Sequence, residues 1–411
     1  MTTRRDLLLI TGGVVAAGGA AALAGCRDEP ARAAVAVPDV LVAESRQGLV
    51  VLGGARPHGF GPAAAVSADG ALVSAVTRDE IGRSTLVQVD PANGVSIRSL
   101  ALGRGWIPRV ISADGRLCAL SRTPATVLPA ARAATALLVT TEGRQRRYDL
   151  AGVVEPDAFT RDGAELFVLE WLPPEAPDRY RVRLLDLASG RVGPLLTRAK
   201  LPVPAGAEEE MHGEGRQAVL SPDRQILYTL YTHQPGHRHT RDLIAGRPGN
   251  VHAFVHVLHL TQRWAYCLDL PDPFGTGPAA GHAVAVSADG GLLAVVDMMT
   301  GHLAYADTAA LTIKQVVAVP AADGTAGLAF GPDRHRVFAG AGTSLTVLDL
   351  GTGAVTARWS APSPIRGLGV SRDAARLYLG GTDEIAWLDA ASGAVRGRAP
   401  VAGLTALRHV R

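Results

Sequence analysis

The segment AVAVSADGGLLAVV, Ala283–Val296, decides the fold of this chain. Two apolar runs flank a short polar stretch in which Ser287 is followed by Asp289 and Gly290. An Asp side chain can accept hydrogen bonds from its own backbone and Gly adopts positive φ freely, so the pattern predicts two strands joined by a tight turn. Variants of this phrase recur at seven marker positions: Ser67, Ser112, Thr160, Ser221, Ser287, Gly331 and Ser371.

The spacing of these markers indicates a repeat. Successive markers are 45, 48, 61, 66, 44 and 40 residues apart. A second phrase, a strand ending in Asp with Gly four residues later, occurs as LVQVDPANG, RLLDLASG, TVLDLGTG and AWLDAASG. Four short strands in each period of about 40 to 45 residues are typical of a β-propeller blade. We therefore expect an all-β protein, a β-propeller with seven complete four-stranded blades.

Strand-like runs remain at both ends of the repeat region. VLVAES and GLVVLGG precede the first marker, and LTALRHV follows the last. The simplest use for these runs is a composite blade that closes the ring and brings the count to eight. A seven-bladed ring with additional terminal strands is the alternative.

The repeat phrases resemble those of bacterial propellers of the YVTN/lactonase-like type. SPDRQILY and TVLDLGTG carry this resemblance, which covers residues from about 60 to 400. The resemblance implies that the first strand of each blade lines a central channel. It also implies that the loops before the first strand and between the second and third strands share one rim.

The first residues of the chain are similar to an export signal. TRRDLLL (residues 3–9) resembles a twin-arginine signal, and LAGC (residues 23–26) resembles the lipobox of bacterial lipoproteins. We expect a signal peptide at residues 1–25, a lipid-modified Cys26, a tether at residues 26–38 and one propeller domain at residues 39–411. This predicts a lipid-anchored protein on the extracytoplasmic face of the cell membrane. An uncleaved anchor formed by residues 7–25 is the alternative.

The composition suits an ordinary globular domain. The chain is 47% hydrophobic and 19% charged, and its 41 basic residues exceed its 38 acidic residues by only three. The densest basic run, Arg144–Arg147, is more typical of a solvated surface than of a nucleic-acid interface, so no nucleic-acid partner is expected. Cys118 and Cys267 lie in apolar strand-like runs, and we expect two buried free thiols.

Two intervals between markers are longer than the repeat requires. The extra residues fall in the stretches 197–216 and 231–253, and the resemblance places both on the same rim. Long loops on a rigid scaffold commonly carry binding residues. Trp171, in a Pro-rich loop that ends a second strand, could form an aromatic wall on this rim or pack against a neighbouring blade.

Aligning the blades on their markers selects a second group of candidates, located five residues before a marker. Polar side chains that met at a channel mouth could hold an anionic or carbonyl-bearing ligand. Polar residues around a water-filled channel are the alternative. The candidates for a ligand site are Glu155, Arg216, His282 and Arg366.

The stretch YTHQPGHRHTRD, residues 231–242, contains three closely spaced histidines. His233, His237 and His239 could bind zinc or copper, and His212 on the neighbouring insertion could add a ligand. The same residues could instead contact a ligand directly. Because a loop containing QPG gives no regular element to fix the geometry, we expect an exposed rim loop, with no metal and no cofactor. His259 aligns with strand-ending Asp residues of other blades and is expected to cap a turn.

The sequence therefore favours a membrane-tethered binding or scaffolding module whose ligand is unknown. The expected partner is a protein or a small anionic molecule at the rim that carries the two long loops. A lactonase-like hydrolase that uses the channel mouth is one alternative, and a metal-binding protein that uses the His-rich loop is another. No GxSxG, HExxH or EF-hand pattern is present.

Overall fold

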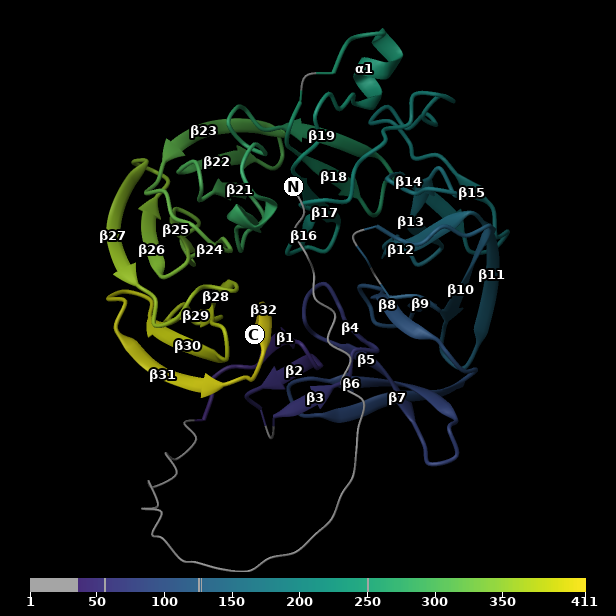
Figure 1. Cartoon of the computed structure of the whole chain (residues 1–411), viewed down its shortest axis with the longest axis horizontal. Coiled ribbons are helices and arrows are strands. Elements are labelled where there is room, and N and C mark those ends of the chain that lie inside the picture. The colour runs from purple at the N-terminus through teal and green to yellow at the C-terminus, as the bar shows by residue number, and fades with distance from the viewer. Residues whose placement is uncertain (1–35, 55–56, 125, 127, 250) are drawn as a thin grey trace, which may run out of the picture. The chain divides into compact units, whose positions relative to one another are not determined.

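The computed structural model describes residues 36–54, 57–124, 126, 128–249 and 251–411. Within these residues the strands form eight four-stranded antiparallel sheets, arranged as blades around a ring (Figure 1). Regular helix in the described chain is confined to α1 (Thr240–Ala245) and the 3-10 turn η1 (Ala279–Gly281). The predicted all-β propeller is confirmed, with the higher of the two blade counts. The predicted signal peptide and Cys26 lie outside the described residues.

Seven blades are each built from four consecutive strands. Blade 1 comprises β4 (Ala64–Val66), β5 (Val73–Arg78), β6 (Ser84–Asp90) and β7 (Val95–Leu102). Blade 2 comprises β8 (Ile107–Ile111), β9 (Cys118–Ser121), β10 (Ala134–Thr140) and β11 (Gln145–Ala151). Blade 3 comprises β12 (Val153–Phe159), β13 (Glu165–Leu172), β14 (Arg179–Asp186) and β15 (Val192–Gly193). Blade 4 comprises β16 (Gln217–Leu220), β17 (Ile226–Tyr231), β18 (Phe254–His259) and β19 (Ala265–Asp269).

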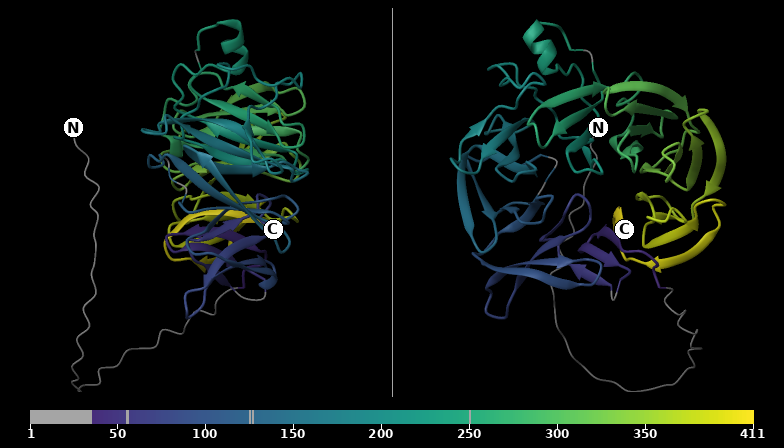
Figure 2. Two further views of the ribbon diagram at one scale, coloured as in Figure 1. Left: turned by 90° about the vertical axis from the view of Figure 1, so that its right-hand side faces the viewer. Right: turned by 180° about the vertical axis from the view of Figure 1, so that it is seen from behind.

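The second half of the ring repeats this arrangement. Blade 5 comprises β20 (His282–Val286), β21 (Leu292–Asp297), β22 (His302–Asp307) and β23 (Thr312–Ala318). Blade 6 comprises β24 (Gly327–Phe330), β25 (Arg336–Ala341), β26 (Ser344–Asp349) and β27 (Ala354–Ser360). Blade 7 comprises β28 (Leu368–Val370), β29 (Arg376–Gly380), β30 (Glu384–Asp389) and β31 (Val395–Pro400). The first strand of each blade is innermost and the fourth is at the edge of the ring (Figures 1 and 2).

The eighth blade joins the two ends of the propeller. Its inner strand is β32 (Leu404–Val410), and its outer strands are β1 (Leu41–Ser45), β2 (Gly48–Leu52) and β3 (His58–Phe60). Val40 and Arg411 exchange two backbone hydrogen bonds of 3.1 and 2.9 Å beyond the end of the β1–β32 pair. The predicted composite blade is therefore confirmed.

A repeated hydrogen-bond pattern shapes the turn between the first and second strands. In blade 5, the Ser287 hydroxyl donates to Asp289 Oδ1 at 2.6 Å and accepts from the Leu292 amide at 2.9 Å. Asp289 Oδ1 also accepts from the Gly291 amide at 3.0 Å, and Gly290 has a φ of 75°. The same hydroxyl-to-carboxylate bond occurs in five further blades, at Ser67–Asp69, Ser112–Asp114, Thr160–Asp162, Ser221–Asp223 and Ser371–Asp373.

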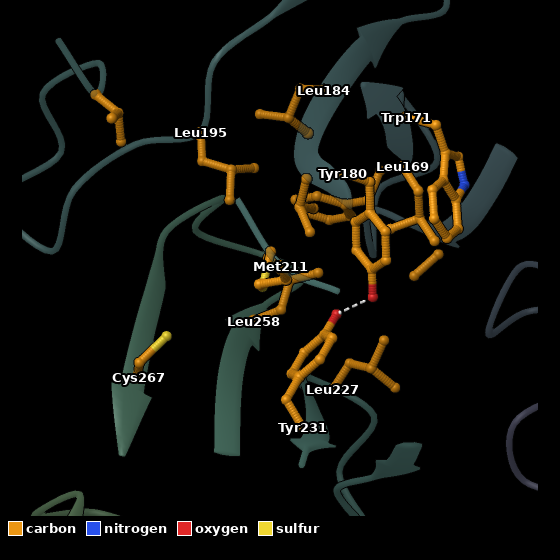
Figure 3. Packing of buried hydrophobic residues seen from close by; sticks show 14 of the residues in the cluster. Leu169, Trp171, Tyr180, Leu184, Leu195, Met211, Leu227, Tyr231, Leu258 and Cys267 are labelled. Atoms are coloured by element: carbon orange, nitrogen blue, oxygen red, sulfur yellow. Dashed lines mark hydrogen bonds between the residues drawn. The ribbon is translucent and has the colours of Figure 1, made fainter. Parts of the chain in front are cut away.

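Apolar side chains fill the spaces between neighbouring blades. One such cluster, between blades 3 and 4, includes Trp171, Tyr180, Met211, Tyr231 and Cys267 (Figure 3). The Tyr180 hydroxyl donates to the Tyr231 hydroxyl at 2.7 Å, which satisfies two polar atoms inside this core. The expectation of buried free thiols is confirmed, because Cys118 and Cys267 are both buried and unpaired. No helix in the described part of the chain has the length and apolar character needed to cross a membrane.

Candidate functional site

The four residues predicted at the channel mouth have separate partners. Glu155 is only 6% exposed, and its Oε2 accepts a hydrogen bond of 3.2 Å from Trp171 Nε1. Its Oε1 lies 3.6 Å from an Arg109 guanidinium nitrogen. Arg216 forms an ion pair with Asp157. Trp171 is 2% exposed, so it packs between blades and provides no aromatic wall on a rim.

The other two candidates lie in different surroundings. His282 is fully buried, with Nε2 accepting from the Gly275 amide at 3.1 Å and lying 3.2 Å from Asp297 Oδ2. Arg366 is exposed, donates to Thr325 Oγ1 at 3.1 Å, and lines a hollow of about 450 Å³ that includes none of the other three candidates. The structure therefore does not show these four side chains assembled into one site.

The two long intervals of the repeat instead contribute residues to a pocket between blades 3 and 4. We call residues 197–216 the first insertion and residues 231–253 the second insertion. The pocket has a volume of about 280 Å³ and is lined by the segment after β15, by both insertions and by β19. Figure 1 shows α1, which belongs to the second insertion, beyond the outer strands of the ring and next to β19. The insertions lie beside each other, as their positions in the repeat predict, but they build a site at the outer edge of the ring. Apolar lining residues include Val182, Leu195, Val203, Met211, Ile244 and Tyr266.

Ion pairs fix the first insertion against blade 3. Glu208 is within 3.0 Å of Arg181 and 3.1 Å of Arg183, both on β14. Glu210 is 2.6 Å from Arg179, at the start of the same strand. The next residue, Met211, exchanges backbone hydrogen bonds of 2.8 and 2.9 Å with Tyr180. The insertion is therefore held along the first part of β14.

Glu209, between these two glutamates, has a different environment. Side chains alternate in direction along an extended segment, and Glu209 contacts groups from blade 4 and the second insertion. The thiol of Cys267 donates to Glu209 Oε2 at 2.9 Å. His237 Nε2 and His239 Nδ1 each lie 3.6 Å from the same oxygen. Glu209, His239 and Cys267 offer ligand atoms that all lie within 4.8 Å of one another. We call Glu209, His237, His239 and Cys267 the pocket cluster.

Further hydrogen bonds orient the members of the pocket cluster. Glu209 Oε1 accepts from the Thr240 amide at 2.7 Å, at the start of α1. His239 Nε2 lies 2.5 Å from Asp269 Oδ1. Arg241 holds Asp269 by donating to its Oδ2 at 2.6 Å, and also donates to the Cys267 carbonyl at 3.0 Å. Phe254 packs against His237 with the ring centroids 4.4 Å apart.

Burial and mutual charge shift the pKa values in this region. Burial favours protonated Glu209, but interactions with His237 and His239 outweigh it and hold the pKa of Glu209 well below its usual value. Burial disfavours a charged His239, yet the carboxylates of Asp269 and Glu209 raise its pKa to about 8. Burial, together with the Glu209 charge, raises the pKa of the Cys267 thiol well above its usual value. Glu209 is therefore a buried carboxylate whose negative charge helps to raise the pKa values of His239 and Cys267.

The expectation of an exposed histidine loop is wrong for two of its three histidines. His237 is 7% exposed and His239 is 1% exposed. His233 does not join them, since its Nδ1 lies 2.9 Å from the Thr232 hydroxyl. His212 is exposed, with Nδ1 3.1 Å from the Asp178 carbonyl oxygen.

His259 accepts at Nδ1 from the backbone amides of Thr261 and Gln262, both at 3.3 Å, which agrees with its expected role as a turn cap. Sequence reasoning missed Glu209 and Cys267 as neighbours of the histidines. The available signal was a run of three glutamates directly before Met211, in an insertion predicted to adjoin the histidine loop. Cys267 gave no such signal, because it lies in an ordinary apolar strand.

Comparisons with known proteins add little to this description. No protein-family model matches the chain, and no curated relative was found. Similar solved structures include dihydro-heme d1 dehydrogenase NirN in complex with DHE, with 16% identity, a TM-score of 0.47, and coverage of 90% of this chain and 75% of that chain. The periplasmic gluconolactonase PpgL of Pseudomonas aeruginosa has 16% identity and a TM-score of 0.42, with coverage of 91% and 99%. A putative 6-phosphogluconolactonase of Bacteroides fragilis has 13% identity and a TM-score of 0.44, with coverage of 90% and 97%. Identities and scores at this level assign no activity to this chain.

Proposed function

We propose that this protein is a membrane-tethered, extracytoplasmic binding module that holds a small, mainly apolar molecule with an anionic group in the pocket between blades 3 and 4. The observation that carries the proposal is the pocket itself, which the two insertions build on a rigid scaffold. Concave, mostly apolar sites with a few polar groups are typical of small-molecule binding.

Two arginines at the pocket support an anionic group on the ligand. Arg198 and Arg241 both line the pocket, and their guanidinium groups lie 5.2 and 5.5 Å from the ring centroid of Tyr266. Arg241 is already paired with Asp269. Arg198 is exposed and, within the described residues, has no carboxylate within 4.0 Å. A guanidinium without a carboxylate partner can bind an incoming carboxylate or phosphate through charge-assisted hydrogen bonds.

A hydrolase that uses the channel mouth has weaker structural support. Concerted acid–base chemistry requires its groups within about 3 Å of the reacting atoms. Glu155, Arg216, His282 and Arg366 each contact a different partner, and His282 has no exposed surface. The geometry therefore supports a binding module more directly than it supports a hydrolase.

A binding experiment with 8-anilinonaphthalene-1-sulfonate, an aromatic sulfonate, tests the proposed pocket. We expect saturable fluorescence enhancement that is weakened at least tenfold by Arg198→Glu, because the new carboxylate repels the sulfonate. Arg366→Glu is the matched control, since it reverses an exposed arginine elsewhere and should leave the affinity unchanged. Equal weakening by both variants, or no saturable binding by folded protein, would contradict the pocket assignment. Acid release from gluconolactone by the purified protein would support the hydrolase instead.

The membrane tether is proposed from the sequence and needs its own test. Lipid modification of Cys26 would hold the propeller at the membrane, because the nearly balanced charge of the chain supplies little attraction to a lipid surface. We expect Cys26→Ala to release the protein from the membrane fraction or to leave an uncleaved precursor. Wild-type protein found in the cytosol with an intact N-terminus would disprove the proposed location at the membrane.

A further inference from the structure

We propose that Glu209, His239 and Cys267, with His237 as the fourth ligand, form a zinc-binding site in the wall of the pocket. This goes beyond the proposed small-molecule binding and does not depend on it. The donors come from three separate segments of the chain: the first insertion, the second insertion and β19. They are brought together by the packing of blade 3 against blade 4.

Two separations within the pocket cluster match those around a tetrahedral metal ion. Zinc binds nitrogen at about 2.0–2.1 Å and sulfur at about 2.3 Å, so ligand atoms around it lie roughly 3.3–3.7 Å apart. Glu209 Oε2 is 3.6 Å from both His237 Nε2 and His239 Nδ1. The Cys267 Sγ to Glu209 Oε2 distance, 2.9 Å, is shorter, because the thiol hydrogen bonds to the carboxylate. Loss of that proton to solvent on metal binding would remove the hydrogen bond and free the thiolate to bind.

Two buried nitrogen atoms of the pocket cluster have no hydrogen-bond partner. These are His237 Nε2 and His239 Nδ1, on side chains that are 3% and 1% exposed. A separation of 3.6 Å is too long for a hydrogen bond to the carboxylate, and buried polar atoms are rarely left unpaired. Both nitrogens point to the same oxygen of Glu209. A cation between them would satisfy all three atoms.

The surrounding hydrogen bonds prepare these atoms for metal binding. His239 Nε2 lies 2.5 Å from Asp269 Oδ1, to which it donates a hydrogen bond in the neutral tautomer that leaves the Nδ1 lone pair directed at Glu209. The Thr240 amide holds Glu209 Oε1 and leaves Oε2 for the metal. A carboxylate behind a histidine ligand is a common second layer at zinc sites, where it fixes the ring and its tautomer.

The types of ligand favour zinc among the common metals. Magnesium and calcium prefer oxygen-only sites. A thiolate with two imidazoles and a carboxylate is a mixed set that suits a tetrahedral, borderline-soft ion. Because Glu209, His239 and Cys267 line the pocket, the ion has a route from solvent.

Metal titration of the full-length protein after chelator treatment tests the site. We expect one equivalent of zinc, measured by elemental analysis, and one equivalent of cobalt with a thiolate-to-cobalt charge-transfer band. The chain has three cysteines, so the variant C26A/C118S keeps only Cys267 and should retain the band. Cys267→Ser should lose it, and His239→Ala should weaken zinc binding at least tenfold. His233→Ala is the matched control in the same loop and should leave the zinc affinity unchanged.

Three outcomes would overturn the proposal. They are wild-type protein that binds less than a tenth of an equivalent of zinc, a C26A/C118S variant that folds but gives no charge-transfer band, and a stoichiometric copper complex that zinc cannot form. Melting curves of each variant without metal separate loss of the site from loss of the fold. Failure of the sulfonate probe to bind would contradict only the small-molecule pocket, because the metal readouts do not depend on that probe.

Discussion

In six blades, a single hydroxyl group organises the turn between the first and second strands. It donates to the Asp two residues later and accepts from a backbone amide five residues later, as at Ser287. Thr160 makes the same two hydrogen bonds in blade 3, where its hydroxyl donates to Asp162 and accepts from the Glu165 amide. The marker in blade 6 is Gly331, which has no hydroxyl, and there Asp333 accepts directly from the Arg336 amide. The residues of the repeated motif are therefore required by the hydrogen bonds of the turn. This is why the motif predicts the fold.

Ser287→Ala should lower the free energy of unfolding by about 1–2 kcal/mol, because it removes both hydrogen bonds of the hydroxyl and leaves the buried Leu292 amide without its acceptor. Urea denaturation would measure the loss. Ser287→Thr is the control, since threonine makes the same bonds at position 160. A loss of the same size in both variants would show that packing, and not the hydroxyl, decides the effect.

The turn aspartates should make stability depend on acid pH. The Ser287 hydroxyl and the Gly291 amide hold the pKa of Asp289 below its ordinary value. A carboxylate with a lowered folded-state pKa stabilises the protein above its unfolded pKa of about 3.9, and this contribution is lost as pH falls through the folded-state pKa. The melting temperature of wild-type protein should therefore fall more steeply below about pH 4 than that of Asp289→Asn. Parallel melting curves for the two proteins would contradict this account.

At the scale of elements, the first insertion shows how an extended segment joins two blades. Glu208 and Glu210 pair with arginines of β14, while Glu209 reaches the histidines and Cys267. Leu196, just after β15, donates its amide to the Arg263 carbonyl before β19 at 2.9 Å. The pocket therefore depends on the contact between blades 3 and 4.

Arg216 directly precedes the inner strand of blade 4, and it is structural as well as polar. Its side chain is 27% exposed, but that of its partner Asp157 is only 9% exposed. Arg216→Ala should lower the free energy of unfolding by roughly 3 kcal/mol, because it leaves a buried carboxylate without its counter-ion. Arg366→Ala, which removes an exposed arginine, should cost less than about 0.5 kcal/mol. Chemical denaturation of the two variants makes the comparison, and equal small losses would show that the Asp157 pair contributes little.

At the scale of the whole molecule, contacts between blades complement the closing blade. Arg224, in the first turn of blade 4, lies 2.5 Å from Asp69 of blade 1 and donates to the Ala113 carbonyl of blade 2 at 2.9 Å. Asp39, just before β1, is 2.7 Å from Arg376 of blade 7. These contacts join residues that are far apart in the sequence.

Removal of residues 404–411 should open the ring. The deletion takes away β32, exposes the edge of β1, and removes the buried side chains of Leu404 and Leu407. We expect a drop of more than 10 °C in the melting temperature and rapid cleavage in limited proteolysis, because an unpaired strand edge and a half-empty core remain. Arg408→Ala, which removes only an exposed ion pair with Glu44, is the control and should melt like wild type. A truncated protein that melts like wild type would show that seven blades suffice.

The sequence by itself determined the propeller and the number of complete blades, and it favoured the composite closing blade over a seven-bladed ring. It could do so because the turns and the strands depend on residues that are neighbours in the sequence. The turn residues Ser287, Asp289 and Gly290, for example, form a pattern that recurs along the chain. It also located both insertions and predicted that they lie side by side. It did not predict the pocket cluster, because burial and the choice of partners are set by contacts between segments distant in the chain. Only the tertiary structure buried His237 and His239, paired Arg216 with Asp157, and brought Cys267 to Glu209 across 58 residues. A strand cysteine and the middle one of three glutamates carry no local sign of this meeting, because the packing of two blades creates it.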